Sequence, residues 1–280
     1  MKIVLINKFL YPKGGDAIST LDIGMLLSKR GHKVYFWGMK HLKNVCYSYN
    51  NYFIENVDYY SNLSFKEKIN TGFKILYSFE AKKKVERFIN EVVKPDIVHL
   101  NNFAHQISPS ILDVFRKYNI PMVMTMHDYK LVCPSYSMLS GGRVCEKCKD
   151  GKYHWCFLKK CTKNSYLKSL INTAEMYLHH KILHIYEKID IFISPSKFLA
   201  EKVKQMGFNK KEIIVLPNFV WVDEFLPEYS WQEDAICYFG RLSFEKGLNT
   251  LIEAIKGLNI TLKIIGEGPL GESLKIKVRN

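Results

Sequence analysis

A glycine, an arginine and a lysine follow a short apolar run near the end of this 280-residue chain. The run, residues 235–239, predicts a strand, and Gly240, Arg241 and Lys246 come after it. Glycine permits close approach of the backbone to a ligand, the arginine guanidinium matches phosphate oxygens, and lysine adds a mobile positive charge. Residues 248–258 predict a helix, whose first amide groups would add to an anion site. The pattern therefore favours binding of a diphosphate.

Other apolar runs also end in small or polar residues that could contact a ligand. These residues are Gly14, Gly15, Asn101, Asn102, His127, Asp128, Ser196, Gly266, Glu267 and Gly268. In open parallel sheets, ligands bind beyond the carboxyl ends of the strands. If the runs are strands of such sheets, their ends converge on one ligand site, and this convergence does not depend on any single motif.

His127 and Asp128 come directly after an apolar run. A single histidine at a strand end is more often a structural residue with its hydrogen bonds satisfied than a functional one. The acidic neighbour and the place at the carboxyl end of a strand favour a functional role, because the surroundings of a histidine set its charge near neutral pH. Gly14 and Gly15 have a similar alternative, since they could simply form a flexible turn.

Apolar runs of strand length recur along the chain, at residues 2–7, 33–37, 96–101, 121–126, 189–194, 212–216, 235–239 and 261–265. Segments of helix length separate most of them, at residues 16–30, 65–93, 108–118, 165–188 and 197–206. The runs are continuously apolar rather than alternating, which is typical of parallel strands whose sheet is covered on both faces. The sequence therefore predicts an α/β fold.

Residues 217–232, rich in proline, tryptophan and acidic side chains, are the expected linker between two domains. The first domain would span about residues 1–225 and the second residues 226–280. After the linker the sequence contains two strand-like runs and the start of a helix, and two strands cannot bury both faces of a sheet. We therefore expect the second domain to be incomplete.

Cysteines are concentrated at residues 133–162, a polar, lysine-rich insertion with little apolar periodicity. Cys145 and Cys148 form a C-x2-C pair, and Cys156 and Cys161 form a C-x4-C pair. Two such pairs match the spacing of a tetrahedral zinc site, and zinc would supply folding free energy that packing cannot supply there. A structural zinc ion is the expected cofactor, because thiolates at all positions leave none open for catalysis. The alternative is a set of reduced thiols in an irregular loop.

The composition is that of a well-packed globular protein with a large positive charge. Hydrophobic residues make up 47% of the chain, with 17 Tyr and 17 Phe, which excludes an intrinsically disordered chain. The formal charge of +14 attracts phosphorylated substrates, anionic membranes or nucleic acid, although a solvated lysine-rich surface explains it equally well. The N-terminal apolar run is too short for a signal peptide, and no run approaches a membrane-spanning length. We therefore expect a cytoplasmic protein.

The motifs and their order resemble those of the retaining glycosyltransferases of family 4, which have the two-domain GT-B fold. The matching segments cover nearly the whole chain and are Gly14–Gly15, Thr125–Asp128, Ser194–Phe198, Leu216–Asn218, Gly240–Gly247 and Gly266–Pro269. The sequence departs from the family in one respect. Family members carry a pair of glutamates nearer the C-terminus that hold the donor nucleotide and its sugar, and this sequence stops at Asn280 before any such pair.

The resemblance implies a GT-B fold, in which a Rossmann-like acceptor domain is followed by the start of a second Rossmann-like domain that holds the donor. It implies transfer of a sugar from a nucleoside diphosphate sugar to a hydroxyl group, with retention of anomeric configuration. The acceptor would be a saccharide or a lipid-linked saccharide in glycan or cell-envelope polysaccharide synthesis. No catalytic metal is implied, and a chain without the glutamate pair would have little activity alone.

The resemblance also implies roles for individual residues. His127 would hydrogen-bond the transferred sugar, while Arg241 and Lys246 would neutralise the departing diphosphate. Residues that bind donor or acceptor or line the cleft would be Gly14, Gly15, Asp128, Ser196, Asn218, Gly240, Gly266, Glu267 and Gly268. The positive charge would suit peripheral association with the inner face of an anionic membrane.

Two other interpretations stay open. The chain could be a non-catalytic fragment that binds donor or acceptor weakly, or a basic, zinc-bearing module that binds nucleic acid. The basic residues do not alternate with an exposed aromatic motif, and a nucleic-acid module would leave the parallel-sheet pattern unexplained. We therefore expect no nucleic-acid partner.

Overall fold

The structure is a computed structural model that describes the chain from Met1 to Arg279, except for residues 46–47, 57–73, 210 and 231–233. It divides into two compact units, Met1–Phe219 and Val220–Asn280, and each is described by itself. The division lies in the segment expected to be a linker, a few residues before the boundary at residue 225 expected from the sequence.

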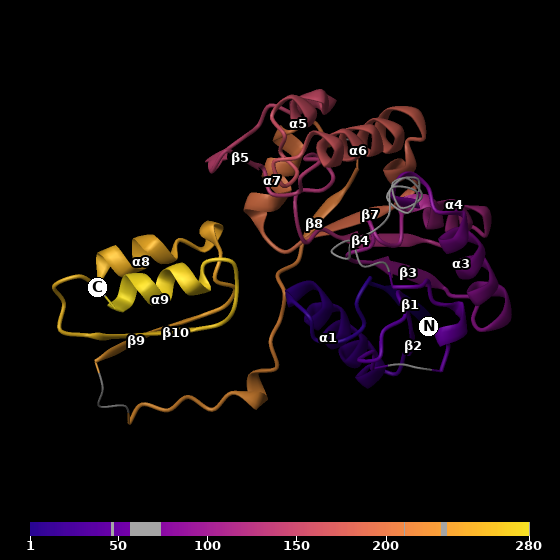
Figure 1. Ribbon diagram of the computed structural model, residues 1–280. Helices are drawn as coiled ribbons and strands as arrows, with labels where there is room; N and C mark the ends of the chain where they lie inside the picture. Colours follow the sequence, from indigo (N-terminus) through magenta and orange to yellow (C-terminus); the bar gives the residue numbers. More distant parts are fainter. Residues whose placement is uncertain (46–47, 57–73, 210, 231–233, 280) are drawn as a thin grey trace. The chain divides into compact units, whose positions relative to one another are not determined.

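The first unit is built on a six-stranded sheet with the order β2-β1-β3-β4-β7-β8 (Figure 1). Its strands are β1 (Lys2–Ile6), β2 (Lys33–Trp37), β3 (Ile97–Leu100), β4 (Met122–Thr125), β7 (Ile191–Ser194) and β8 (Ile213–Val215). All neighbouring strands are parallel, as the continuously apolar runs predict. The chain runs from β1 outward to β2 and then returns past β1 to β3. Parallel sheets bind ligands at such a reversal of strand order.

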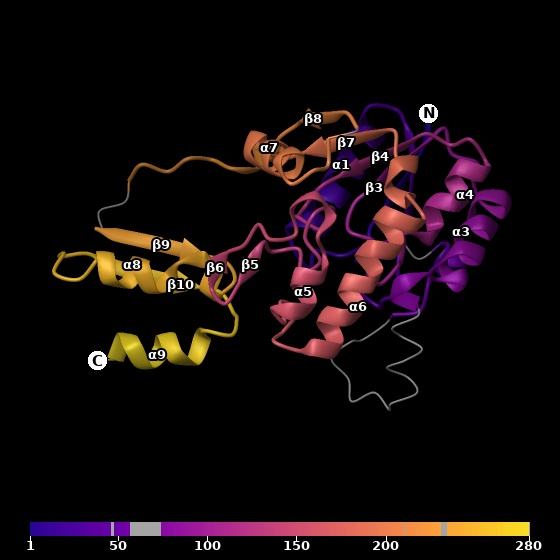
Figure 2. The ribbon, with the colours of Figure 1, turned by 90° about the horizontal axis from the view of Figure 1, so that it is seen from above.

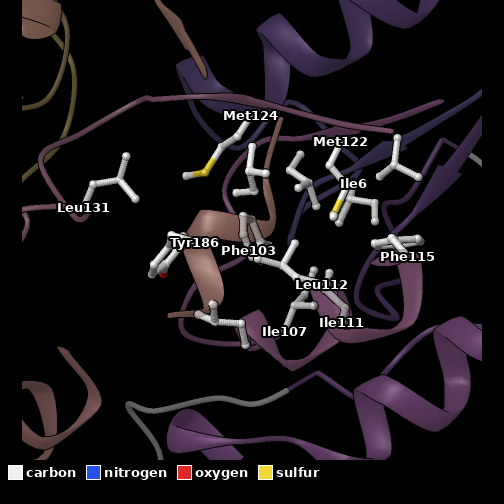
Figure 3. Packing of buried hydrophobic residues seen from close by; sticks show 14 of the residues in the cluster. Ile6, Phe103, Ile107, Ile111, Leu112, Phe115, Met122, Met124, Leu131 and Tyr186 are labelled. Carbon is white, nitrogen blue, oxygen red and sulfur yellow. The ribbon is translucent and has the colours of Figure 1, made fainter. Parts of the chain in front are cut away.

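The sheet is buried because its strands are apolar on both faces. Val4, Leu5 and Ile6 of β1 have no exposed surface. Figure 3 shows part of this core, in which Ile6, Met122 and Phe115 belong to one cluster of buried hydrophobic residues. Burial of each such side chain contributes about 1.5–3 kcal/mol to the free energy of unfolding. The sheet is therefore a rigid platform for the loops at its carboxyl edge.

Helices connect the strands of the first unit. They are α1 (Gly15–Lys29), α3 (Phe79–Glu91), α4 (Leu112–Lys117), α5 (His154–Leu158), α6 (Tyr166–Tyr177) and α7 (Lys197–Gln205). Helix α1 packs on β1 and β2, α7 packs on β7 and β8, and α5 and α6 lie side by side (Figure 2). Ser78, Ser165 and Ser196 cap α3, α6 and α7, each accepting a hydrogen bond from an amide in the first turn.

Several helix predictions differ from the structure or extend beyond the described residues. The first helix begins at Gly15 rather than at Asp16, so the Asp16 side chain lies within the first turn and is not the cap. The predicted helix at residues 65–93 is represented by α3, and the part before residue 74 lies outside the described residues.

The second unit is smaller and contains the parallel strands β9 (Ala235–Phe239) and β10 (Thr261–Ile265), with α8 (Leu248–Ala254) and α9 (Gly271–Arg279). Its buried core consists of Leu242, Leu248, Ile252 and Leu274. The predicted helix at residues 248–258 thus ends earlier, at Ala254. In the described part of the chain no helix is long and apolar enough to cross a bilayer.

Candidate functional site

The carboxyl ends of β1 and β3 meet at the reversal of strand order in the first unit. Asn7 follows β1, Asn101 and Asn102 follow β3, and both Asn7 and Asn101 are buried. The side-chain oxygen of Asn7 accepts hydrogen bonds from the backbone amides of Lys8 (3.0 Å) and Asn102 (3.2 Å). These bonds fix the two loops to each other, so the groups they carry have defined positions.

His127 lies beyond the end of β4, next to the loop after β3. Its Nε2 atom is 3.0 Å from the Oδ1 atom of Asn101. Because an amide oxygen only accepts, Nε2 carries the proton and Nδ1 remains the acceptor of the ring. Burial lowers the pKa of His127, and the nearby Asp16 carboxylate partly opposes this shift. At neutral pH the ring is therefore a neutral hydrogen-bonding group.

Asp128 and Lys8 place opposite charges at the same corner. Burial raises the pKa of Asp128, although a hydrogen bond from the Lys130 amide (2.8 Å) and the charge of Lys8 act in the other direction. Burial likewise lowers the pKa of Lys8, and the charges of Asp16 and Asp128 limit the shift. A polar ligand that replaces lost hydration would interact strongly with these partly desolvated groups.

A small hollow of about 30 Å³ lies at this corner. Its lining includes Asn101, His105, His127, Asp128, Lys130 and Tyr136. The side-chain amide nitrogen of Asn101 is buried and has no hydrogen-bond partner in the described residues. A buried donor without a partner costs about 1–3 kcal/mol, which a ligand oxygen accepting from it would recover.

Helix α1 starts beside the hollow. Gly14 is its N-cap, with extended backbone, and a β-carbon on Gly15 would meet no atom within 4 Å. Contacts within the protein therefore do not require glycine at position 15. A ligand that lies close to this backbone would require it, because a side chain would occupy the same space. Asp16 accepts a hydrogen bond from the side-chain amide of Asn102 at 2.9 Å, which attaches the first turn of α1 to the loop after β3.

Ser196 and Asn218 lie at other strand ends of the first unit. The Ser196 hydroxyl accepts a hydrogen bond from the Leu199 amide at 3.1 Å and so caps α7. The Asn218 side chain accepts a hydrogen bond from the Ser19 hydroxyl of α1 at 3.4 Å, after the end of β8. Both side chains are thus engaged with the protein, Ser196 at a helix start and Asn218 beside α1.

In the second unit, two glycine loops lie side by side at the carboxyl ends of β9 and β10. Backbone hydrogen bonds join them from Gly240 to Ile265 (3.0 Å) and from Leu242 to Glu267 (2.9 Å). A β-carbon on Gly266 would be 1.9 Å from the carbonyl oxygen of Gly240, and Gly266 has φ of +145°. Glycine is required there because the two loops touch through their backbones.

Arg241 and Lys246 are exposed on the loop that leads from β9 to α8. The carbonyl of Arg241 accepts a hydrogen bond from the Tyr238 hydroxyl at 2.9 Å, which fixes the backbone of Arg241. Lys246 belongs to a short 3-10 turn, Phe244–Lys246, before Gly247 in left-handed conformation. The second unit thus brings together Gly240, Arg241, Lys246, Gly266, Glu267 and Gly268, and the first unit brings together Gly14, Gly15, His127 and Asp128.

The cysteines predicted to bind a metal lie in the connection between β4 and α6. Cys145 follows a short hairpin, β5 (Leu139–Ser140) and β6 (Arg143–Val144), and Cys156 is buried in α5. Among the described residues, no three histidine, cysteine or carboxylate side chains stand in ligand positions around a common point.

The sequence did not single out Lys8, Asp16 or Lys130 as site residues. Each is an ordinary charged residue next to a strand or helix end, and its relevance appears only when the strand order brings the ends of β1, β3 and β4 together. Asn101 and Asn102 carried a signal, because both follow an apolar run. The position of His127 against Asn101 could have been inferred from a parallel pairing of β3 with β4.

Three solved structures share the fold over the whole chain. Anabaena Alr3699/HepE in complex with UDP is 15% identical, with a TM-score of 0.56. The lipopolysaccharide outer core galactosyltransferase WaaB is 17% identical, with a TM-score of 0.50. An alpha-glucosyltransferase in complex with UDP and a 13-mer DNA is 11% identical, also with a TM-score of 0.50.

The match covers 100% of this chain in each case, but 64% of the HepE and WaaB chains and 59% of the alpha-glucosyltransferase. This chain therefore spans about three fifths of their length. No significant match is found among proteins of curated function. The parallel sheet and its structural neighbours identify the fold as GT-B. The profile of Glycosyltransferase Family 4 matches residues 13–224, most of the first unit, and this chain therefore belongs to glycosyltransferase family 4.

Proposed function

We propose that the protein transfers a sugar from a nucleoside diphosphate sugar, with uridine diphosphate as the carrier, to a hydroxyl of a saccharide or lipid-linked saccharide, with retention. Family membership supports glycosyl transfer, and the HepE and alpha-glucosyltransferase structures that share the fold contain UDP. The observation that carries the proposal is the pair of glycine loops beyond β9 and β10, because they present Arg241 and Lys246 beside exposed backbone.

The second unit would act on the donor. The Arg241 guanidinium would donate paired hydrogen bonds to phosphate oxygens, and Lys246 would add charge. Negative charge on the diphosphate grows as the bond between the sugar carbon and the phosphate oxygen breaks. Cations that stabilise this charge lower the barrier of the transfer step.

The first unit would act on the sugar and the acceptor. Neutral His127 would hydrogen-bond the transferred sugar, and Asp128 with the Asn101 amide would orient hydroxyl groups. As the acceptor oxygen bonds to the sugar carbon, its proton would pass to the leaving phosphate oxygen. This route needs no strong base from the protein, which suits a histidine whose pKa is lowered. Because the acceptor attacks on the side from which the phosphate leaves, the route supports retention.

The acceptor would come from glycan or cell-envelope polysaccharide synthesis. A formal charge of +14 supports a lipid-linked acceptor and peripheral association with an anionic membrane surface.

Calorimetric titration of the chain with UDP tests the donor assignment. We expect Arg241→Ala to weaken binding by about 1.5–3 kcal/mol, the contribution of a charge-assisted hydrogen-bonded pair. Lys256→Ala is the matched control, since Lys256 is an exposed cation of the same unit that pairs with Glu253 at 2.8 Å. Equal UDP affinity in the wild type and Arg241→Ala, or no UDP binding by the wild type, would contradict the assignment.

Retention is tested separately, by proton NMR of the first product formed from a UDP-sugar of known anomeric configuration. A product of the same configuration supports the mechanism above. A product of inverted configuration would show that a protein base, with Asp128 as the nearest carboxylate, takes the acceptor's proton instead.

A further inference from the structure

The cysteines at residues 145–161 gather in space although the chain between them is irregular. The hairpin of β5 and β6 leads into a tight turn that carries Cys145 and Cys148, in which the Lys149 amide donates to the Glu146 carbonyl at 3.1 Å. Lys147, between the two cysteines, lies over the Trp155 ring at 4.8 Å. The turn therefore packs directly on α5, the helix that carries Cys156.

The two thiol pairs lie close to each other. Cys148 is near enough to Cys133, Cys161 and Cys145 for their charges to interact. The backbone amide of Cys161 donates to the Cys156 carbonyl at 3.0 Å, which closes the C-x4-C turn, and the Cys156 thiol lies 3.9 Å from the Thr162 hydroxyl. The C-x2-C turn and the C-x4-C turn are thus neighbours in the fold as well as in the sequence.

The backbone of this segment contains an unusual number of left-handed residues. Non-glycine residues with positive φ between β4 and α6 are Tyr136, Met138, Asp150, Lys160, Lys163 and Asn164. Each such conformation costs roughly 1–2 kcal/mol for residues other than glycine. Regular secondary structure here is limited to the two-residue strands of the hairpin, a 3-10 turn at Lys149–Gly151 and the five residues of α5. A crosslink that holds the turns together would offset this cost.

We propose that Cys145, Cys148, Cys156 and Cys161 together bind one structural zinc ion. Two close thiol pairs, one from a turn after a hairpin and one from a short helix and the turn after it, provide the four sulfur ligands of a tetrahedral site. Cys148 is 7% exposed and Cys156 is 1% exposed, so the ion would be shielded from solvent. A complete set of protein ligands leaves no position for substrate, and the role is structural.

Among the described residues, no three histidine, cysteine or carboxylate side chains stand in ligand positions around a common point. Binding of zinc would release the thiol protons and form Zn–S bonds of about 2.3 Å. It requires rotation of the cysteine side chains toward a common centre between the two turns.

The ion would also act on the candidate site, because the same segment forms part of its wall. Tyr136 lines the hollow beside His127, and its carbonyl accepts a hydrogen bond from the Tyr129 amide at 3.1 Å. The Asn172 side chain of α6 donates to the Pro134 carbonyl at 3.2 Å and to the Thr162 hydroxyl at 3.0 Å. Both ends of the cysteine segment are thereby fixed to α6, with the thiol pairs between them.

Metal analysis of the full chain, purified under reducing conditions without added metal or chelator, tests the proposal. We expect about one zinc per chain in the wild type and in the control Cys237→Ser, whose thiol is exposed in the second unit. We expect zinc to be lost in Cys145→Ser/Cys148→Ser and in Cys156→Ser. Wild-type protein without zinc would overturn the proposal, as would zinc retained by both variants.

A second measurement does not depend on the folding of the variants. Chelator-treated wild-type protein is titrated with Co²⁺ and followed by absorption. Tetrahedral cobalt bound by thiolates shows strong charge-transfer and d–d bands, and one equivalent of Zn²⁺ should abolish them. Absence of these bands, or a disulfide between Cys156 and Cys161 found by mass spectrometry under the same reducing conditions, would overturn the proposal.

Discussion

Lys130 and Glu175 form a buried ion pair next to the candidate site. The Lys130 ammonium and the Glu175 carboxylate are 2.7 Å apart, with 6% and 0% of their side chains exposed. His105 and His179 lie near the same carboxylate, at 3.5 and 3.8 Å. Lys130 is the residue whose amide binds Asp128, so the pair connects α6 to the loop of His127 and Asp128.

Removal of the Glu175 carboxylate should destabilise the protein strongly. Glu175→Ala leaves the Lys130 ammonium buried without its partner, and we expect a loss of about 3–5 kcal/mol in the free energy of unfolding. The control is Glu91→Ala, because Glu91 pairs with Arg87 at 3.0 Å on the surface, where such pairs contribute about 0–1 kcal/mol. Urea unfolding measures both. Equal effects of the two substitutions would show that water reaches Lys130.

The sequence indicated His127 and Asp128 as candidate site residues but not the residues that hold them in place. His127 and Asp128 follow an apolar run, and this pattern can be recognised from the sequence alone. Glu175 lies in the last turn of the amphipathic helix α6, where an acidic residue normally faces solvent, and its burial depends on Lys130 from a distant loop. Such pairs between remote segments leave no pattern in the sequence.

At the scale of elements, the two glycine loops of the second unit contact each other directly through their backbones. Gly266 approaches Gly240 so closely that any side chain at position 266 would overlap the carbonyl oxygen of Gly240. The strand runs at residues 235–239 and 261–265 were predicted within the bounds observed. Their parallel pairing was expected from the class of fold, whereas contact between the two loops follows from the register, which pairs Ile265 with Phe239.

Gly266→Ala should therefore separate the two loops and loosen the ends of β9 and β10. Alanine at φ of +145° is strained, and its β-carbon would be 1.9 Å from a backbone oxygen that cannot rotate away. We expect a loss of more than about 2 kcal/mol in local stability, seen as faster amide hydrogen exchange in both loops. In Gly271→Ala, the control, the added carbon meets its nearest neighbour, Leu242, at 3.8 Å. Unchanged exchange in Gly266→Ala would contradict the observed contact.

The long helix predicted at residues 165–188 shows where periodicity alone fails. Helix α6 ends at Tyr177, and the chain continues as a π-helical turn, Leu178–Ile182, and a 3-10 turn, Ile185–Lys188. The break follows tertiary contacts, because His179 hydrogen-bonds the Leu76 carbonyl at 2.6 Å and the His180 ring stacks on Tyr186 at 4.9 Å. A cavity of about 220 Å³ lies beside this turn. Helical spacing of apolar residues does not record such contacts.

At the scale of the whole molecule, buried histidines connect stability to pH. Burial lowers the pKa of His99 to about 4, of His179 to about 4 and of His180 to about 3. His179 is buried and His99 and His180 are partly buried, and the Nε2 atom of His180 has no hydrogen-bond partner in the described residues. In the unfolded chain these rings would titrate near 6.5.

The lowered pKa values fix the sign of the pH dependence. Between about pH 4 and 6.5 these three histidines bind more protons in the unfolded chain than in the folded one, so their contribution to the free energy of unfolding rises with pH through this window. Stability from these groups is complete above about pH 6.5 and is lost as the pH falls towards 4. Carboxylates with lowered pKa values, such as Asp113 and Glu86, act at lower pH, because their unfolded values are already near 4.

We therefore expect the free energy of unfolding to fall steeply from pH 6.5 to pH 5, by up to about 1.4 kcal/mol per pH unit for each buried histidine. Urea unfolding at a series of pH values measures the slope. His180→Phe keeps an aromatic ring on Tyr186 and removes one titrating group, so its slope should be shallower by that amount. His32→Phe is the control, because His32 is only partly buried, beside the N-terminal amino group. A flat profile in the wild type, or equal slopes in wild type and His180→Phe, would mean that the histidine rings gain protons without unfolding, through water that enters the cavity beside the π-helical turn.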